Sequence, residues 1–290
     1  MKDSAVLLID CPDQRGLVAR VSSLLYASGA NILHADQHQD HNLGLFFMRV
    51  EWALRDGSPS AAHDFDLEAF KAVFAPLASS LDMRWNLTVG TSRPRMALFC
   101  SQYLHCMADL LHRWRTGELL CEIPVIISNH RDVERLAAFY GVPFEHVPVT
   151  SATRAEAEAR QVELLERHNV DFVVLARYMQ ILSPEFVHRY PNAVINVHHS
   201  FLPAFTGARP YHAAHARGVK LIGATSHYVT EILDDGPIIE QDVARISHRD
   251  QVEDLVERGR DLERIVLSRA VRWHLDRRIL CYGNKTVVFD

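Results

Sequence analysis

Hydrophobic and polar positions alternate with two different periods along the first ninety residues. Residues 4–10 form an apolar run typical of a strand, a turn rich in Pro, Asp and Gly follows, and the apolar positions from Leu17 to Leu25 recur at helical spacing. We also predict strands over 31–38, 43–52 and 83–89, and a helix over 66–82, where apolar positions again recur at helical spacing. This order of elements is the split βαβ pattern, and it predicts a ferredoxin-like βαββαβ domain.

Beyond residue 95 the pattern changes to short apolar runs separated by helical segments. The runs lie at 96–100, 123–128, 171–176 and 193–197, and the helical segments lie near 104–114, 131–140, 153–168 and 183–189. This alternation predicts an α/β domain with a doubly wound, mostly parallel sheet. A long helix over 249–273 and a hairpin that turns at Gly283 and Asn284 follow near the end of the sequence.

The segment between the two patterns has the composition of a linker. Residues 90–95 are GTSRPR, a combination of Gly, Ser, Pro and two arginines without hydrophobic periodicity. We therefore predict a first domain over 1–89, a linker over 90–95 and a second domain over 96–290.

Composition and charge exclude some classes of partner. The 290 residues are 48% hydrophobic and 23% charged, which is typical of a globular protein with a sizeable core. The formal net charge of −5 gives no general attraction to nucleic acid or to anionic membranes. We expect neither as a partner.

The cysteines and the apolar runs indicate the compartment. The five cysteines are odd in number, scattered and mostly set in apolar runs, so we expect reduced thiols in the core. Asp3 and Asp10 interrupt any basic-then-apolar leader, and no apolar run approaches the roughly 20 residues that span a bilayer. These features predict a cytoplasmic protein.

Polar side chains that could take part in catalysis lie at the end of the apolar run 193–197 and directly after it. Asn196, His198, His199 and Ser200 lie where that strand ends, and ligands of doubly wound sheets bind beyond the carboxyl ends of the strands. Asp234 and Asp235 occupy a later turn closed by Gly and Pro. Structural alternatives are a hydrogen-bonded strand end for the first group and ordinary turn chemistry for the two acids.

These segments resemble a known family. NVHHSFLPAF and HYVTEILDDGPIIEQD are similar to the signature of the formyltetrahydrofolate-dependent formyltransferases, and the resemblance is strongest to the deformylases among them. Deformylases join an N-terminal ACT-type regulatory domain to a formyltransferase-fold domain, and the resemblance covers nearly the whole chain. It implies 10-formyltetrahydrofolate as the substrate, no tightly bound cofactor, a homo-oligomer, and a role in balancing one-carbon folate pools that links to purine biosynthesis.

The resemblance assigns catalytic roles to three residues. The family's Asn and His fall on Asn196 and His198, and its acid falls on Asp234, whereas Asp235 occupies a family glycine position. Formyl chemistry passes through a tetrahedral intermediate, so it needs oxyanion donors, a proton shuttle and an orienting acid, which these three residue types supply.

The resemblance also assigns residues to a folate pocket. It implies binding largely through backbone groups of two loops, with the candidate residues Arg177, Tyr178, Met179, Gln180, Leu182, Tyr228, Val229 and Ile232. Gln180 departs from the basic residue that the deformylases have at this position, which predicts a difference in folate affinity or in recognition of the folate tail.

The acceptor of the formyl group is predicted from another loop. Ribonucleotide-using family members resemble one another in a glycine-rich loop after the first strand of this domain, whereas residues 101–106 are SQYLHC and contain no glycine. Water is then the natural acceptor, and the reaction becomes hydrolysis to formate and tetrahydrofolate. Two alternatives remain: formyl transfer to an amine, and a non-enzymatic folate or amino-acid sensor.

The turn after the first strand suggests an effector site. It resembles the loop by which ACT-type domains bind amino acids between subunits, and the candidate residues are Asp13, Gln14, Arg15, Gly16, Leu17 and Asn31. The alternative is a helix-entry turn in which Asp13 caps the helix and Gly16 permits close packing.

No metal site is predicted among the seventeen histidines. His198 with His199, and His212 with His215, lack the converging Cys or carboxylate ligands that metal sites require. His105 and Cys106 are either a wall of the active site or a base and a nucleophile, and formyl chemistry needs no covalent thiol.

Overall fold

The computed structural model describes residues 4–55, 65–90, 93–204 and 210–290, so residues 91 and 92 of the predicted linker lie outside it. The chain forms two compact units: residues 1–93, 277–280 and 287–290 belong to the first, and residues 94–276 and 281–286 to the second. The prediction placed all of 96–290 in the second domain. The difference arises because Phe289 is buried and Arg49 Nε donates to the Arg277 carbonyl at 3.0 Å within the first unit.

The first unit is the predicted ferredoxin-like domain. Its elements are β1 (Ser4–Pro12), α1 (Leu17–Ala27), β2 (Asn31–Asp40), β3 (Leu45–Ala53), α2 (Leu67–Ser80) and β4 (Arg84–Val89). The four strands form a sheet in the order β2-β3-β1-β4, and each neighbouring pair is antiparallel. The sequence pattern succeeded here because β1, β3 and β4 have apolar residues on the face that the two helices cover.

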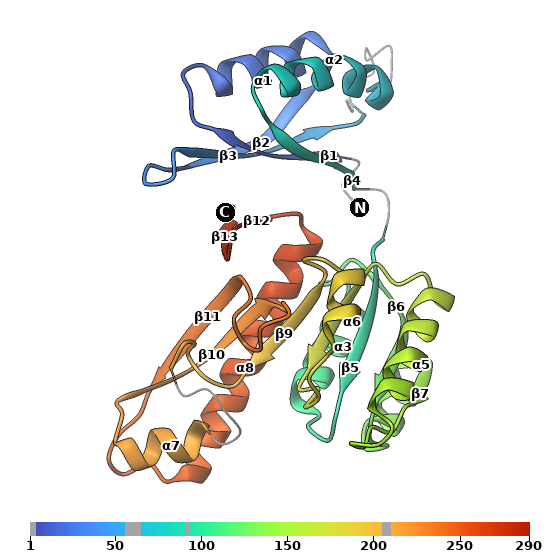
Figure 1. The fold of residues 1–290 in the computed structure, drawn as a ribbon, viewed down its shortest axis with the longest axis vertical. Helices are drawn as coiled ribbons and strands as arrows, with labels where there is room; N and C mark the ends of the chain where they lie inside the picture. Colours follow the sequence, from blue (N-terminus) through green and yellow to red (C-terminus); the bar gives the residue numbers. More distant parts are fainter. Residues whose placement is uncertain (1–3, 56–64, 91–92, 205–209) are drawn as a thin grey trace. The chain divides into compact units, whose positions relative to one another are not determined.

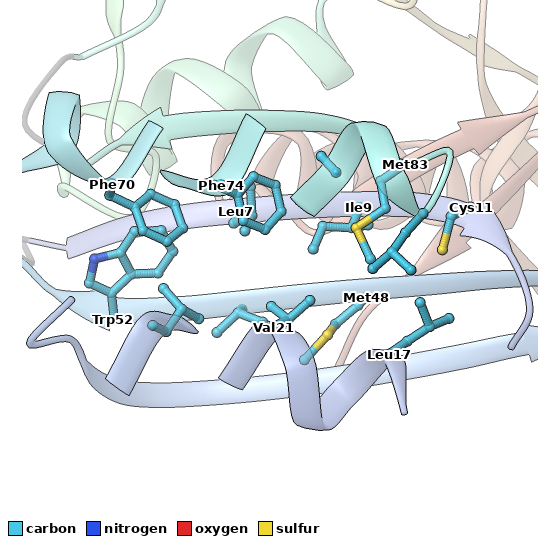
Figure 2. Close-up of a cluster of buried hydrophobic side chains, with 14 of the residues drawn as sticks. Leu7, Ile9, Cys11, Leu17, Val21, Met48, Trp52, Phe70, Phe74 and Met83 are labelled. Atoms are coloured by element: carbon cyan, nitrogen blue, oxygen red, sulfur yellow. The ribbon is translucent and has the colours of Figure 1, made fainter. Parts of the chain in front are cut away.

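Two helices and one sheet face enclose the core of this unit, as Figure 2 shows. Trp52 and Phe70 lie with ring centroids 5.4 Å apart, and Phe70 stacks on Phe74 at 5.3 Å. All three side chains are at most 1% exposed, and each such burial contributes about 1.5–3 kcal/mol to folding. Asp66 caps α2 by accepting hydrogen bonds from the amides of Glu68 and Ala69.

The second unit contains the predicted doubly wound sheet. Its strands are β5 (Arg95–Cys100), β6 (Glu122–Ser128), β7 (Phe144–His146), β8 (Phe172–Ala176), β9 (Val194–His198), β10 (Leu221–Tyr228) and β11 (Ile238–Arg245). Their order is β11-β10-β9-β8-β5-β6-β7. Strands β5 to β9 are parallel, and β10 runs antiparallel to both of its neighbours. The fold class is therefore confirmed.

Helices connect and cover these strands (Figure 1). They are α3 (His105–Arg115), α4 (Glu134–Tyr140), α5 (Arg154–Arg167), α6 (Pro184–Arg189), α7 (Pro210–Arg217) and α8 (Val252–Leu275), and the chain then forms the hairpin of β12 (Ile279–Tyr282) and β13 (Lys285–Val288). Side chains of α5 and α6 join the core of β5, β6 and β8, whereas α8 packs on β9 to β11 and on α3. Among the described residues, no helix has the length and hydrophobicity needed to cross a membrane.

Three adjacent strands bring the candidate site together. Cys100 of β5 pairs with Ala176 of β8, and Leu175 of β8 pairs with Asn196 of β9. Because these strands are parallel, the residues that follow them leave the sheet at the same edge. The loop after β5, the loop after β8 and the His198–Ser200 segment therefore lie side by side.

Candidate active site

Asp234 lies against His198, as the sequence predicted for a catalytic pair. Its Oδ1 is 3.3 Å from His198 Nδ1, and both side chains are largely buried. The hydrogen bond from His198 lowers the pKa of Asp234, so the carboxylate is charged at neutral pH. Asp234 has a φ of 57°, a left-handed conformation that Asp tolerates better than most residues.

Gly236 allows the Asp234 turn to close on β10. A Cβ atom at this position would lie 1.7 Å from the Tyr228 carbonyl oxygen, which leaves no room for any side chain. The Tyr228 amide donates to the Pro237 carbonyl at 3.0 Å and closes the same turn. The Gly-Pro pair noted in the sequence is thus the reason that Asp234 reaches His198.

His227 orients Asn196, and sequence reasoning missed it. The Tyr228 carbonyl lies 2.9 Å from His227 Nδ1 and can only accept, so Nδ1 holds the proton of the neutral ring. Burial lowers the pKa of His227, which keeps the ring neutral. Its Nε2 therefore accepts from Asn196 Nδ2 at 3.2 Å and leaves the second amide hydrogen of Asn196 for another acceptor.

Thr225 fixes the loop that follows β9. Its hydroxyl donates to the Ser200 carbonyl at 2.8 Å and accepts from the Leu202 amide at 3.0 Å. Gln241 Nε2 donates to the same hydroxyl at 2.9 Å and to the Leu202 carbonyl at 3.1 Å. These hydrogen bonds hold the segment next to His198 rigid, as pre-organised catalysis requires.

His199 is packed between His198 and Tyr211. Its ring stacks on His198 with centroids 5.1 Å apart and lies 6.0 Å from the Tyr211 ring. Burial, and secondly the positive charge of Arg177, lower the pKa of His199 to about 4. His199 is therefore neutral at physiological pH.

We expect the protein to lose stability below pH 6.5 through His199. Its folded-state pKa lies below the usual 6.5, so the unfolded chain takes up the proton first, and the stabilisation present above pH 6.5 is lost as pH falls toward 4. This one group should contribute about 2 kcal/mol to the change in unfolding free energy between pH 7 and pH 5. Urea unfolding of the native protein and of His199→Asn measures it.

In the His199→Asn variant, the change in unfolding free energy between pH 7 and pH 5 should be smaller by about 2 kcal/mol than in the native protein. This holds whatever the stability of the variant at pH 7. His212→Asn is the matched control, because His212 is exposed on α7 and should leave the native pH dependence intact. An unchanged pH slope in His199→Asn would contradict the expectation.

A buried carboxylate, Glu263 of α8, holds several groups beside this pair. It is 1% exposed, and its oxygens lie 2.8 Å from His105 Nε2, 2.8 Å from the Tyr211 hydroxyl and 3.4 Å from Arg177 Nε. Although burial raises the pKa of Glu263, the His105 hydrogen bond and the charge of Arg177 outweigh it, so the pKa is lowered and the carboxylate is charged.

Gly259, one turn before Glu263 on α8, makes this arrangement possible. A Cβ atom there would lie 2.0 Å from the Tyr211 hydroxyl oxygen. The absent side chain lets Tyr211 reach Glu263 across the helix surface. No local sequence signal marked Glu263, since a single Glu in a long amphipathic helix is usually a solvent-facing residue.

His105 and Cys106 form part of the wall of this buried cluster. Burial raises the pKa of Cys106 well above its usual value, so it is a neutral thiol and a poor nucleophile. Ligand atoms of His105, Cys106 and Glu263 lie within 4.8 Å of one another, but Glu263 is already engaged by His105, Tyr211 and Arg177. His212 and His215 are exposed on α7.

The predicted folate residues divide into core and exposed positions. Tyr178 and Tyr228 are buried, and their hydroxyls are engaged by Gln161 and His274 at 2.8 Å, so neither hydroxyl is offered to a ligand. Arg177 is also buried, at 8% exposed. The side chains with at least partial exposure are Met179, Gln180, Leu182, Val229 and Ile232.

An open groove of about 910 Å³ borders the loop after β8. Its lining comes from α5, from the segment Ile181–Phe186 and from Glu231 of the Asp234 loop. The groove therefore shares residues with both loops that the sequence assigned to folate.

The predicted effector residues lie around the start of α1. Gly16, not Asp13, is the N-cap residue, with a φ of 87° and no side-chain cap, so the capping prediction for Asp13 was wrong. Asp13 instead accepts from Gln39 Nε2 at 2.9 Å. Gln14, Arg15 and Asn31 are exposed, whereas Leu17 lies in the core.

At the edge of this mostly parallel sheet, Asp234 contacts His198 and lies 3.9 Å from His227, which in turn binds Asn196. The fold and these side chains are those of a formyl-transferring class of enzyme domain. A family model described as formyl transferase matches residues 94–271, and one described as ACT domain matches residues 5–51. The chain is similar to glycinamide ribonucleotide transformylase 1 from Symbiobacterium toebii, with a TM-score of 0.65 and 31% identity, and the match covers 71% of this chain and 98% of that one.

Full-length similarity narrows the class. A formyltetrahydrofolate deformylase from Synechocystis sp. is 51% identical over 99% of this chain and 98% of its own length. The crystal structure of a formyltetrahydrofolate deformylase from Pseudomonas syringae pv. tomato has a TM-score of 0.93 and 49% identity, and the match covers 99% of this chain and 94% of that one. The chain belongs to the formyltetrahydrofolate deformylase family.

Proposed function

We propose that this protein hydrolyses 10-formyltetrahydrofolate to formate and tetrahydrofolate, and that Asn196, His198 and Asp234 perform the reaction. The contact of Asp234 with His198, next to an Asn196 amide oriented by His227, is the observation that supports these roles most directly. Membership in the deformylase family supports the reaction.

The first step is the attack of water on the formyl carbon. Asp234 orients the water and accepts its proton while the new carbon–oxygen bond forms. The formyl oxygen becomes an oxyanion, which the second amide hydrogen of Asn196 and the ring of His198 stabilise. Asp234 Oδ1, 3.3 Å from His198 Nδ1, fixes the direction of the ring.

The second step is the departure of the folate nitrogen. The bond between this nitrogen and the formyl carbon breaks, the nitrogen takes up a proton, and formic acid ionises to formate. Because the pKa of Asp234 is lowered, its carboxyl holds the proton only transiently and passes it on. The sum is amide plus water giving amine, formate and a proton.

The loop after β5 favours water over an amine acceptor. Ser101 donates to Asn129 Oδ1 at 2.7 Å and accepts from the Met179 amide at 3.1 Å, so its side chain ties three loops of the sheet edge together. Tyr103 packs against Arg177, with the guanidinium carbon 5.0 Å from its ring centroid. Side chains thus take the place where a glycine-rich loop would expose amides to a phosphate.

The folate itself fits between the loop 177–182 and the loop 228–234. Met179, Ile181, Ile232 and Leu233 are 48–66% exposed, and apolar side chains exposed on two neighbouring loops suit a flat aromatic ligand. We expect the pterin to use backbone groups of these two loops other than those of Tyr228, whose amide and carbonyl already bind Pro237 and His227. The cofactor-free reaction needs only this substrate and water.

Counting both products tests the proposed reaction. Incubation with 10-formyltetrahydrofolate should release formate and tetrahydrofolate in equal amounts, and adding glycinamide ribonucleotide should change neither yield. Appearance of a formylated amine in place of formate would establish a transferase, and absence of both products would leave a sensor as the function.

We further propose an amino-acid effector site at the start of α1, supported by the ACT-domain match. Gln14, Arg15 and Asn31 offer exposed polar groups there, and the left-handed Gly16 exposes the first amides of the helix. In ACT-type domains such sites lie between subunits, which fits a homo-oligomer. The test is to measure formate release in the presence of each amino acid in turn, and to compare the native protein with Asn31→Ala.

A further inference from the structure

Arg177 stands out among the buried side chains because its charge is only partly matched. The residue is 8% exposed, and neither Nε nor Nη1 makes a hydrogen bond to any described residue. Its nearest carboxylate oxygen, on Glu263, lies 3.4 Å from Nε, while Glu263 also engages His105 and Tyr211. A buried guanidinium with unused N–H groups is costly unless a ligand binds them.

The backbone at Arg177 is also strained. Its φ of 62° lies in the left-handed region, which costs about 1 kcal/mol or more for a residue with a long side chain. The arginine is held there by the Tyr103 ring on its face and by the Ser101 amide, which donates to the Arg177 carbonyl at 3.3 Å. A strained, buried arginine with free donors indicates a functional constraint.

Shared neighbours place this guanidinium in the same buried cluster as the catalytic histidine. Arg177 Nε lies 3.4 Å from Glu263, and Glu263 accepts from the Tyr211 hydroxyl at 2.8 Å. The Tyr211 ring lies against His199, which stacks on His198, and the charge of Arg177 helps to lower the pKa of His199. Two more buried donors or acceptors without a described partner, His198 Nε2 and Ser200 Oγ, belong to the same segment of β9 and its loop.

We propose that Arg177, Ser200 and His198 form a pocket for a small carboxylate, and that its ligand is the formate produced by the reaction. This assignment rests on the proposed function. A guanidinium binds a carboxylate through two parallel N–H···O bonds, and a hydroxyl and an imidazole complete the four acceptor positions of formate. The pocket takes up the product at the point where the formyl carbon is cleaved, away from the exposed folate loops.

The pocket can be tested without turnover by titrating the full-length protein into ¹³C-labelled sodium formate. Binding is then measured from the line width of the ¹³C signal of formate. Native protein should broaden the formate signal saturably. Arg177→Met should weaken binding about tenfold or more, and Ser200→Ala should weaken it less, since charged hydrogen bonds contribute more than neutral ones. Arg189→Met is the matched control, because Arg189 is exposed and pairs with Glu166 on the surface.

Arg177→Lys keeps the charge without the two-pronged geometry and protects the test against misfolding of the Met variant; it should bind formate with intermediate affinity. Equal formate binding in native protein, Arg177→Lys and Ser200→Ala would overturn the proposal. Displacement of formate by p-aminobenzoylglutamate would also overturn it, because the pocket would then serve the carboxylates of the folate tail.

The two proposals fail separately. Formate binding that depends on Arg177 in a protein that releases no formate from 10-formyltetrahydrofolate would support the pocket and refute the hydrolase. Formate release by a protein whose formate binding does not depend on Arg177 would support the hydrolase and refute the pocket.

Discussion

Asp234→Asn should lower the rate of formate release about a thousandfold while leaving folate binding nearly unchanged. The amide keeps the size of the side chain and its place opposite His198, but it cannot accept the proton of the attacking water, and such proton transfers contribute roughly a hundredfold to ten-thousandfold. Formate release at saturating substrate, together with a binding titration with tetrahydrofolate, provides the two measurements.

Asp235→Asn is the control for this variant. Asp235 is the neighbouring residue of the same turn, it is exposed, and it should retain near-native turnover. Near-native turnover in Asp234→Asn, or an equal loss in both variants, would remove Asp234 from the proposed mechanism.

Glu263→Gln should destabilise the second unit by about 3 kcal/mol, the cost of leaving a buried charge without its partner. Glutamine retains the shape of glutamate and can still hydrogen-bond to His105 and Tyr211, so the loss comes mainly from the uncompensated charge of Arg177. The unfolding free energy from urea titration measures the effect.

Glu257→Gln on the same helix makes the identical chemical change at an exposed position and should alter the unfolding free energy by no more than about 0.5 kcal/mol. If the two variants were equally stable, the carboxylate of Glu263 would not be the counter-charge that holds Arg177 and Tyr211.

Local patterns were sufficient for most of the fold. Periodicity identified both helices and strands β1, β3 and β4 of the first unit, because each has an apolar face against a shared core, whereas β2 contributes only the partly buried Ile32. In the second unit it missed β7, which has only three residues, and β11, whose eight residues are mostly exposed or partly exposed at the sheet edge. Short or edge strands lack the buried alternation that a sequence pattern detects.

The sequence by itself was enough to predict the three proposed catalytic residues and their order along the chain, since each lies in a local motif: a strand end for Asn196 and His198, and a Gly-Pro turn for Asp234. The same was true of the glycine-free loop 101–106. Side-chain chemistry and short-range turn geometry are both written in neighbouring residues.

Only the tertiary structure decided how these groups are held. His227 orients Asn196 from an adjacent strand, and Glu263 reaches His105 from 158 positions along the chain. The hydrogen bonds, burial and lowered pKa values at this edge arise from packing α8 against β9 to β11 and against α3. Contacts between distant segments depend on the closed fold, and for that reason no local pattern marked Arg177 as a buried cation paired with Glu263.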